Sequence, residues 1–139
     1  MLKGSVLKSV FKRHGEEGLF TRLVTSATQL AAVLALYKIV LLENEEALIW
    51  YQEENDYLMI TDKRVIFRNN FNNKEDIIIA LTQLKEANYV ISEQPVVTFG
   101  KFTMLAITDI AGNRYLLKTE APPVFNGIYQ LLHTAICTT

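Results

Sequence analysis

The spacing of hydrophobic and polar residues changes near Glu43 and divides the chain into two differently patterned parts. Before that point apolar residues recur every three or four positions, which is the spacing of one face of an α-helix. After it, apolar and polar residues alternate in short runs, as in half-buried β-strands. The pattern predicts a helical extension over residues 1–42 and a mainly β body over residues 43–139.

The helical extension is predicted to contain a short helix and a longer one, separated near Gly15 and Gly18 because glycine weakens helices. The longer helix, residues 19–42, has a broad apolar seam without charged borders. An exposed stripe of this length would be a large apolar patch for a monomer, so we predict that it binds a second copy or another protein. Packing against the protein's own body is the alternative. The seam consists of Phe20, Leu23, Ala27, Leu30, Leu34, Tyr37 and Leu41.

The body is predicted to contain seven strands and a closing helix. Short polar turns separate the strands, and their Asn and Gly residues accept left-handed backbone angles. Pro122 and Pro123 open the last helix, where a missing N–H costs little, and its apolar face includes Ile128, Leu131 and Leu132. The predicted strands are residues 47–53, 56–61, 63–69, 75–81, 86–92, 103–110 and 114–119.

A charged corner separates two of these strands, within the sequence YLMITDKRVIF (residues 57–67). A catalytic role for Asp62, Lys63 or Arg64 would require a partner group and a dry pocket. At a hairpin tip, however, Asp accepts backbone N–H bonds and flanking charges keep the strand ends soluble. We therefore interpret the corner as a turn.

The order of seven short strands followed by one amphipathic helix resembles the bacterial pleckstrin-homology-like (PH-like) domains over about residues 43–136. The resemblance implies an α+β fold, in which a strongly bent antiparallel barrel or sandwich is capped by the C-terminal helix. The N-terminal helix or helices precede this body. Eukaryotic members usually carry a Trp on the closing helix, whereas the only Trp here, Trp50, lies in the first predicted strand. The matching motifs are ENEEALIWY (residues 43–51), YLMITDKRVIF (57–67), IIIALTQL (77–84) and AITDIAGNRYLLK (106–118).

Many eukaryotic PH domains bind inositol phosphates near their first hairpin loop. The corresponding loop here, QEEND (residues 52–56), is acidic and would repel a phosphate. Its carboxylates suit a hard cation, but such side chains more often form a solvated tip, and we predict no metal and no other cofactor. The densest basic group of the body is either a contact site for an anionic lipid or acidic partner, or a solvated strand face. It consists of Lys63, Arg64, Arg68 and Lys74.

Charge is divided unevenly, although the formal net charge is only −1 and favours no nucleic-acid partner. Residues 1–42 carry six basic and two acidic residues, whereas the remainder carries eight basic and 13 acidic residues. The basic arm suggests an alternative function, peripheral attachment to anionic lipid, with Leu7, Val10 and Phe11 inserting into the membrane. The basic residues of the arm are Lys3, Lys8, Lys12 and Arg13.

Few residues could carry chemistry. Cys137 is the only cysteine, which excludes an internal disulfide and a site built on several cysteines. His14 and His133 are far apart in the sequence, and no nucleophile elbow, phosphate-binding loop or dinucleotide fingerprint occurs. The uncharged run between Arg22 and Lys38 is shorter than the ~20 residues that a membrane span requires. The sequence thus predicts a non-enzymatic interaction module in the cytoplasm, at the inner face of the membrane if the basic arm binds lipid.

Overall fold

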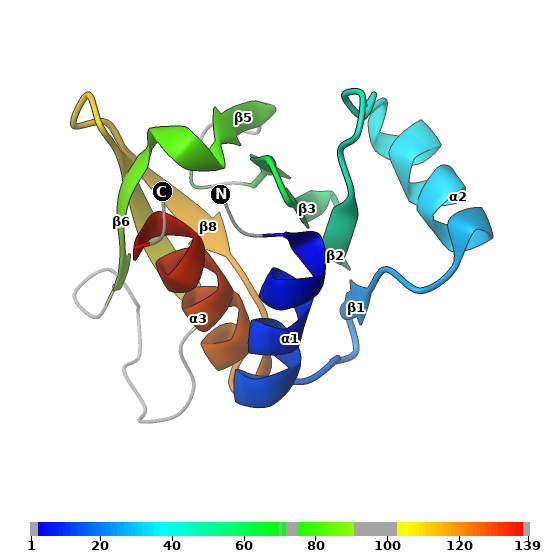
Figure 1. Ribbon diagram of the computed structural model, residues 1–139, viewed down its shortest axis with the longest axis horizontal. Coiled ribbons are helices and arrows are strands. Elements are labelled where there is room, and N and C mark those ends of the chain that lie inside the picture. The colour runs from blue at the N-terminus through cyan, green and yellow to red at the C-terminus, as the bar shows by residue number, and fades with distance from the viewer. Residues whose placement is uncertain (1–2, 70, 72–74, 91–102, 138–139) are drawn as a thin grey trace.

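The structure, a computed structural model, describes residues 3–69, 71, 75–90 and 103–137 (Figure 1). Five strands form one antiparallel sheet in the order β1-β2-β3-β4-β5, and three strands form a second in the order β6-β7-β8. The first sheet contains β1 (Thr21–Leu23), β2 (Ala47–Glu53), β3 (Asp56–Thr61), β4 (Arg64–Arg68) and β5 (Ile77–Ala80). The second contains β6 (Leu84–Tyr89), β7 (Met104–Asp109) and β8 (Arg114–Lys118).

Tight turns join consecutive strands and fix their pairing. The β7–β8 turn is organised by the Asp109 carboxylate, which accepts the backbone N–H groups of Ala111 and Asn113. Gly112 in this turn has φ +92°, a left-handed angle that glycine adopts without strain. A short 3₁₀ turn, Leu81–Gln83, leads from β5 in the first sheet to β6 in the second.

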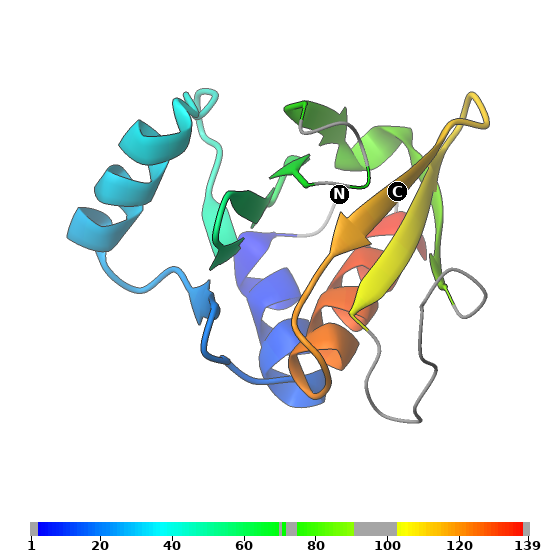
Figure 2. The same ribbon diagram turned by 180° about the vertical axis from the view of Figure 1, so that it is seen from behind.

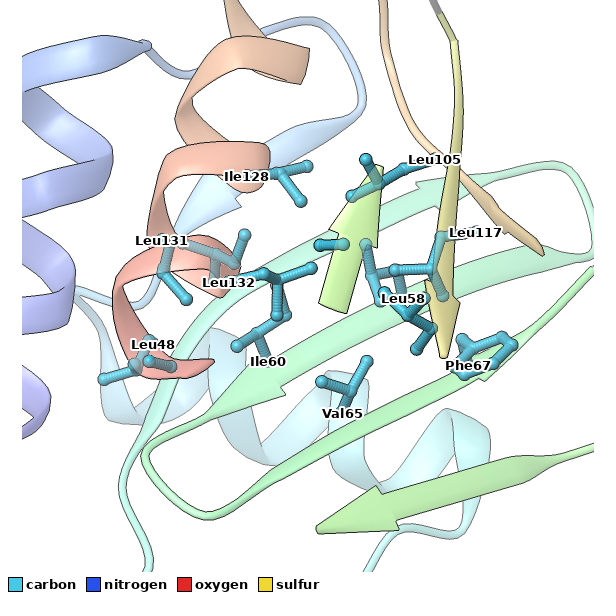
Figure 3. Packing of buried hydrophobic residues seen from close by; sticks show 14 of the residues in the cluster. Leu48, Leu58, Ile60, Val65, Phe67, Leu105, Leu117, Ile128, Leu131 and Leu132 are labelled. Carbon is cyan, nitrogen blue, oxygen red and sulfur yellow. The ribbon is translucent and has the colours of Figure 1, made fainter. Parts of the chain in front are cut away.

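Helices α1 (Gly4–His14) and α3 (Val124–Cys137) lie side by side and close one end of the sheets (Figures 1 and 2). Leu7 and Phe11 of α1 are completely buried, as are Ile128, Leu131 and Leu132 of α3. Figure 3 shows the α3 side chains pointing toward those of the first sheet. Burying a side chain of this size contributes about 1.5–3 kcal/mol, so both helices are integral parts of the main core.

The predicted PH-like body is confirmed in architecture. All seven predicted strands are found where the structure describes them, and the last helix begins directly after Pro122 and Pro123. The predicted ranges 47–53 and 56–61 match β2 and β3 without a shift. The part of the predicted strand 86–92 that follows residue 90 lies outside the described residues.

The prediction of one helix over residues 19–42 is wrong. Thr21–Leu23 forms β1 and pairs with β2 through contacts such as Thr21↔Tyr51, while the helix α2 covers only Ala27–Tyr37. Ser26 caps the start of α2 by accepting the Gln29 N–H at 3.3 Å, and Lys38, with φ 57°, ends it. The described residues 3–42 therefore supply two helices and a strand, of which α1 and β1 pack into the body.

Candidate interaction surface

The charged corner at residues 61–64 is a hydrogen-bonded turn, as predicted. Thr61 Oγ1 accepts the backbone N–H groups of Lys63 and Arg64 at 3.0 and 2.8 Å. Asp62 accepts the N–H of Glu46 at 2.9 Å, and Lys63 Nζ donates to the Glu43 carbonyl. The turn thus holds the chain segment that leads from α2 into β2, which gives its charged residues a structural role.

Glu45 is the centre of this attachment. Its side chain is buried, and Arg64 donates to it from Nε at 2.8 Å and from Nη2 at 2.7 Å. Thr61 Oγ1 and the Leu42 N–H donate to the same carboxylate at 2.7 and 2.8 Å. Burial alone would raise the pKa of Glu45, but these hydrogen bonds outweigh it and hold the pKa below its ordinary value. Arg64 is consequently a paired cation and not an open anion site.

Helix α2 packs on the outer side of the first sheet and lies at the side of the molecule away from β6 (Figures 1 and 2). Tyr37 stacks on Tyr57 with ring centroids 3.9 Å apart, and the Tyr57 hydroxyl donates to Asp76. Arg68 pairs with Asp76 at 2.7 Å and lies over the Tyr57 ring. The remaining helix contacts come from Leu30, Val33 and Leu34, against Ala47, Trp50, Met59 and Ile66 of the sheet.

The predicted apolar seam is therefore divided among different environments. Leu30, Leu34 and Tyr37 contact the protein's own sheet, which was the alternative to partner binding. Phe20 precedes β1 and is exposed, and Leu23 lies in β1 beside the main core. Ala27 is exposed at the start of α2, and Leu41 is half-buried beyond its end. A role for these residues in partner binding stays a prediction.

Three of the large apolar side chains that remain exposed lie at or just after the C-terminal end of α2. Leu36 is 61% exposed, and Val40 and Leu42, which follow the helix, are 82% and 51% exposed. None of the three belongs to the predicted seam, and their exposure was therefore not predicted. The one signal that pointed to this region is the absence of charged residues from Ala27 to Tyr37.

Within the part of the chain that the structure describes, three recesses border α2. The first, of about 370 Å³, lies between α2 and the start of β2, where Lys8 and Glu46 are part of its wall. The second, of about 250 Å³, lies between residues 37–40 and strands β3 to β5, and its wall includes Val40, Ile66 and Ile78. The third, of about 330 Å³, is lined by Leu36, Gln52 and Arg68 among others. A helix bordered by recesses leaves room for side chains of another molecule.

Of the basic residues predicted to contact a lipid or acidic partner from the body, Lys63, Arg64 and Arg68 form hydrogen bonds or ion pairs within the protein. Lys74 lies outside the described residues. In the N-terminal arm, Lys8 Nζ donates to the Val24 carbonyl at 2.6 Å. The side chains of Lys3, Lys12 and Arg13 are exposed, and their contact with an anionic surface stays a prediction.

The proposed insertion of Leu7, Val10 and Phe11 into a membrane is wrong, because all three are buried against the protein's own core. Their helical periodicity is real, but the apolar surface that they cover belongs to α3 and the first sheet. Within the described residues, no helix is long and apolar enough to cross a bilayer.

The acidic loop at residues 52–56 supplies one partner of a partly buried ion pair. Asp56 is buried and accepts Lys118 Nζ at 2.9 Å, which joins the first hairpin to β8. Glu53 accepts the Tyr51 hydroxyl at 2.7 Å, while Glu54 adopts a left-handed angle in the turn. Among the described residues no three His, Cys, Asp or Glu side chains are grouped as metal ligands would be.

The fold is that of a PH-like domain, and solved structures of bacterial origin share it. A DUF1696 family protein with a pleckstrin-homology domain from Shewanella loihica PV-4 aligns with 86% of this chain and 99% of its own, with TM-score 0.55 and 14% identity. A pleckstrin homology domain from Shewanella amazonensis SB2B aligns with 83% of this chain and 91% of its own, with TM-score 0.52 and 20% identity. No family model matches the sequence, and no curated protein matches it.

Proposed function

We propose that this protein is a non-enzymatic PH-like interaction module, which binds a second copy or another protein through the surface at the C-terminal end of α2. The observation that carries the proposal is the uncharged helix with three exposed apolar residues at its end, Leu36, Val40 and Leu42. We call these three residues the α2 patch. The charged corner and the acidic loop, where chemistry could have been sought, are occupied by internal hydrogen bonds.

The composition of α2 supports this function. A helix that is apolar on all sides is typical of a buried position, yet only one side of α2 packs on its own sheet. The other side carries small residues such as Ala31 and Ala35, which allow a partner to approach the helix closely. No charge would have to be desolvated along Ala27–Tyr37 when a partner covers it.

The size of the α2 patch limits the expected affinity for a partner. Burying an apolar side chain of this size contributes about 1.5–3 kcal/mol, whereas association costs roughly 4–15 kcal/mol. Three side chains alone therefore give weak binding at best, and a useful interface must extend beyond them. The neighbouring recesses and the edge of the first sheet are the surfaces into which it can extend.

Sedimentation velocity over a range of micromolar concentrations tests self-association, with the double variant Leu36→Lys, Val40→Lys beside the wild type. The matched control is Leu19→Lys, because Leu19 is 83% exposed but lies outside the α2 patch. We expect the double variant to dissociate at higher protein concentrations than the wild type. The control should dissociate at the same concentrations as the wild type.

If the wild type is a monomer throughout, binding of another protein is tested by placing a photo-crosslinking residue at position 36 or at position 19. A defined protein joined repeatedly from position 36 but not from position 19 supports the proposal. Equal crosslinking from both positions, in a protein that also does not self-associate, overturns it.

A further inference from the structure

Strand β5 is the uncharged edge of the first sheet. Ile77–Ala80 pairs with β4 on one side, and within the described residues its other side makes no backbone hydrogen bond. Every second residue of such a strand directs its N–H and C=O groups away from the paired neighbour. These groups form a template on which another strand can pair.

The other edge strands of the two sheets differ from β5 in charge. Strand β1 contains Arg22, β6 contains Lys85 and Glu86, and β8 contains Arg114 and Lys118. Charged side chains on an edge oppose pairing with another chain, because pairing would force them together or out of water. Strand β5 has only isoleucines and an alanine, so it lacks this protection.

The exposed side chain of β5 faces the recess beside the α2 patch. Ile77 and Ile79 pack with the main core, whereas Ile78 points outward and is 58% exposed. Ile78 and Val40 both belong to the wall of the 250 Å³ recess. The recess, whose wall also includes Lys38, Arg64 and Asp76, therefore joins the end of α2 to the open edge of the sheet.

We propose that two copies of this chain associate by antiparallel pairing of β5 with the partner's β5 across a twofold axis. The inference rests on the proposed function, that the protein self-associates near α2, and names the contact. In the register that places Ile78 opposite the partner's Ile78, the two side chains lie on the same face of the joined sheets. The two recesses and both Val40 side chains then border this pair.

The charges next to β5 fit this pairing. In the same register Asp76 stands opposite the partner's Ala80, and Glu75 stands opposite the partner's Leu81. No two like charges face each other, so the strand is complementary to its own antiparallel copy. An unrelated partner would have to supply an equally apolar strand.

The substitution Ile78→Lys tests the contact, because it places two ammonium groups opposite each other at the twofold axis. Ile110→Lys is the matched control: Ile110 is 62% exposed and lies in the β7–β8 turn, away from β5. In sedimentation velocity we expect Ile78→Lys to raise the dimer dissociation constant at least ~10-fold and the control to leave it unchanged. Circular dichroism and thermal melts establish that both variants are folded.

The substitution Ile78→Cys, in a chain whose Cys137 is changed to Ser, tests the register without adding charge. Side chains directly opposite in an antiparallel pair are close enough for a disulfide. We expect mild oxidation to give a covalent dimer from Ile78→Cys and none from Ile110→Cys in the same background.

The outcomes separate this pairing from the proposed function. A dimer that persists in Ile78→Lys but dissociates in the Leu36→Lys, Val40→Lys variant overturns β5 pairing and leaves the α2 patch as the interface. A wild type that stays monomeric, with no crosslink at position 78, overturns the pairing as well, and the α2 patch is then tested by the crosslinking at position 36. Loss of the dimer in Ile78→Lys together with a crosslink at position 78 supports the pairing.

Discussion

Gly15 at the end of α1 lies directly against Gly127 in the first half of α3. A Cβ atom added to Gly15 would approach the Gly127 Cα to 2.7 Å, and a Cβ on Gly127 would lie 2.8 Å from Cδ2 of the buried Phe11. Real Cβ atoms do not tolerate such distances from backbone or from a packed ring. The absence of side chains at both positions is what allows the two helices to approach.

We predict that Gly127→Ala destabilises the protein by about 1–3 kcal/mol, the usual cost of overpacking a core. The direction of this change in stability is informative, because alanine inside a helix is otherwise favoured over glycine by ~1 kcal/mol. Urea unfolding followed by the fluorescence of Trp50 measures the change. Asn126→Ala, an exposed neighbour on the same helix, is the control. A Gly127→Ala protein as stable as the wild type would show that α1 can shift without cost.

Among substitutions in and near the charged corner, those that break the buried pair of Glu45 and Arg64 should lower the stability of the protein most. Removing the Glu45 charge by Glu45→Gln leaves Arg64, which is mostly buried, without its counterion, and we expect a loss of about 2–4 kcal/mol. Asp76→Asn removes the partner of Arg68 in a pair that is half-exposed, and should cost less than ~1 kcal/mol. Similar losses in the two variants would contradict the structural role assigned to Glu45.

The pair of Glu45 and Arg64 also predicts that the stability of the protein depends on pH. Because the pKa of Glu45 is lower in the folded protein than its ordinary value of 4.5, the folded state favours the ionised carboxylate. Its contribution is complete above that value and is lost as the pH falls through the lower, folded-state pKa. The stability difference between the wild type and Glu45→Gln should therefore shrink on acidification below about pH 4.5. Thermal melts of both proteins across this range measure it, and a difference that is constant with pH would count against the assignment.

The short apolar runs and the polar turns between them predicted the bounds of β2 and β3, because both strands end in tight polar turns. Strand β1 was not predictable in this way. It has only three residues, and its structure is decided by pairing with Ile49 and Tyr51, which are distant in sequence. The neighbouring apolar residues Leu19, Phe20 and Val24 are equally compatible with a helix. A local pattern cannot decide between the two when a tertiary contact supplies most of the hydrogen bonds.

The candidate surface was harder to predict than the fold. The seam identified the side of α2 that packs inward, because hydrophobic periodicity shows which side of a helix is buried. Periodicity does not show whether the same chain or another molecule covers that side. Val40 and Ile78 are far apart in sequence, and only the packing of α2 on β2 to β4 brings them to the same recess. The sequence did indicate an apolar segment without charge, and the three-dimensional arrangement shows which of its side chains remain exposed.

The hydroxyl groups of Tyr37 and Tyr57 provide a matched pair within one aromatic stack. The Tyr37 hydroxyl is buried without a hydrogen-bond partner among the described residues, whereas the Tyr57 hydroxyl donates to Asp76 at 3.0 Å. Tyr37→Phe should leave stability unchanged or raise it by up to ~1 kcal/mol, and Tyr57→Phe should lower it by about 0.5–1.5 kcal/mol. Denaturant unfolding of the two variants measures both values. The reverse order would show that the Tyr37 hydroxyl has a partner in solution.

Glu120 fixes the approach of the N-terminal segment to the sheet. Its two carboxylate oxygens accept the backbone N–H groups of Leu19 and Phe20 at 3.0 and 2.8 Å, across about a hundred residues of sequence. A Cβ atom on Gly18 would collide with the same carboxylate. Because the bonds come from a charged acceptor, their loss in Glu120→Ala should free this segment, and we expect the amides of residues 19–23 to exchange with solvent ~10-fold faster or more.

Hydrogen exchange measured residue by residue tests this expectation, with Glu86→Ala on the exposed face of β6 as the control. The amides of β3 should keep their protection in both variants, because β3 pairs with β2 and β4 on its two sides. Faster exchange throughout the first sheet would mean that Glu120 stabilises the whole fold. Unchanged exchange at Leu19 and Phe20 would mean that pairing of β1 with β2 is sufficient to hold the segment in place.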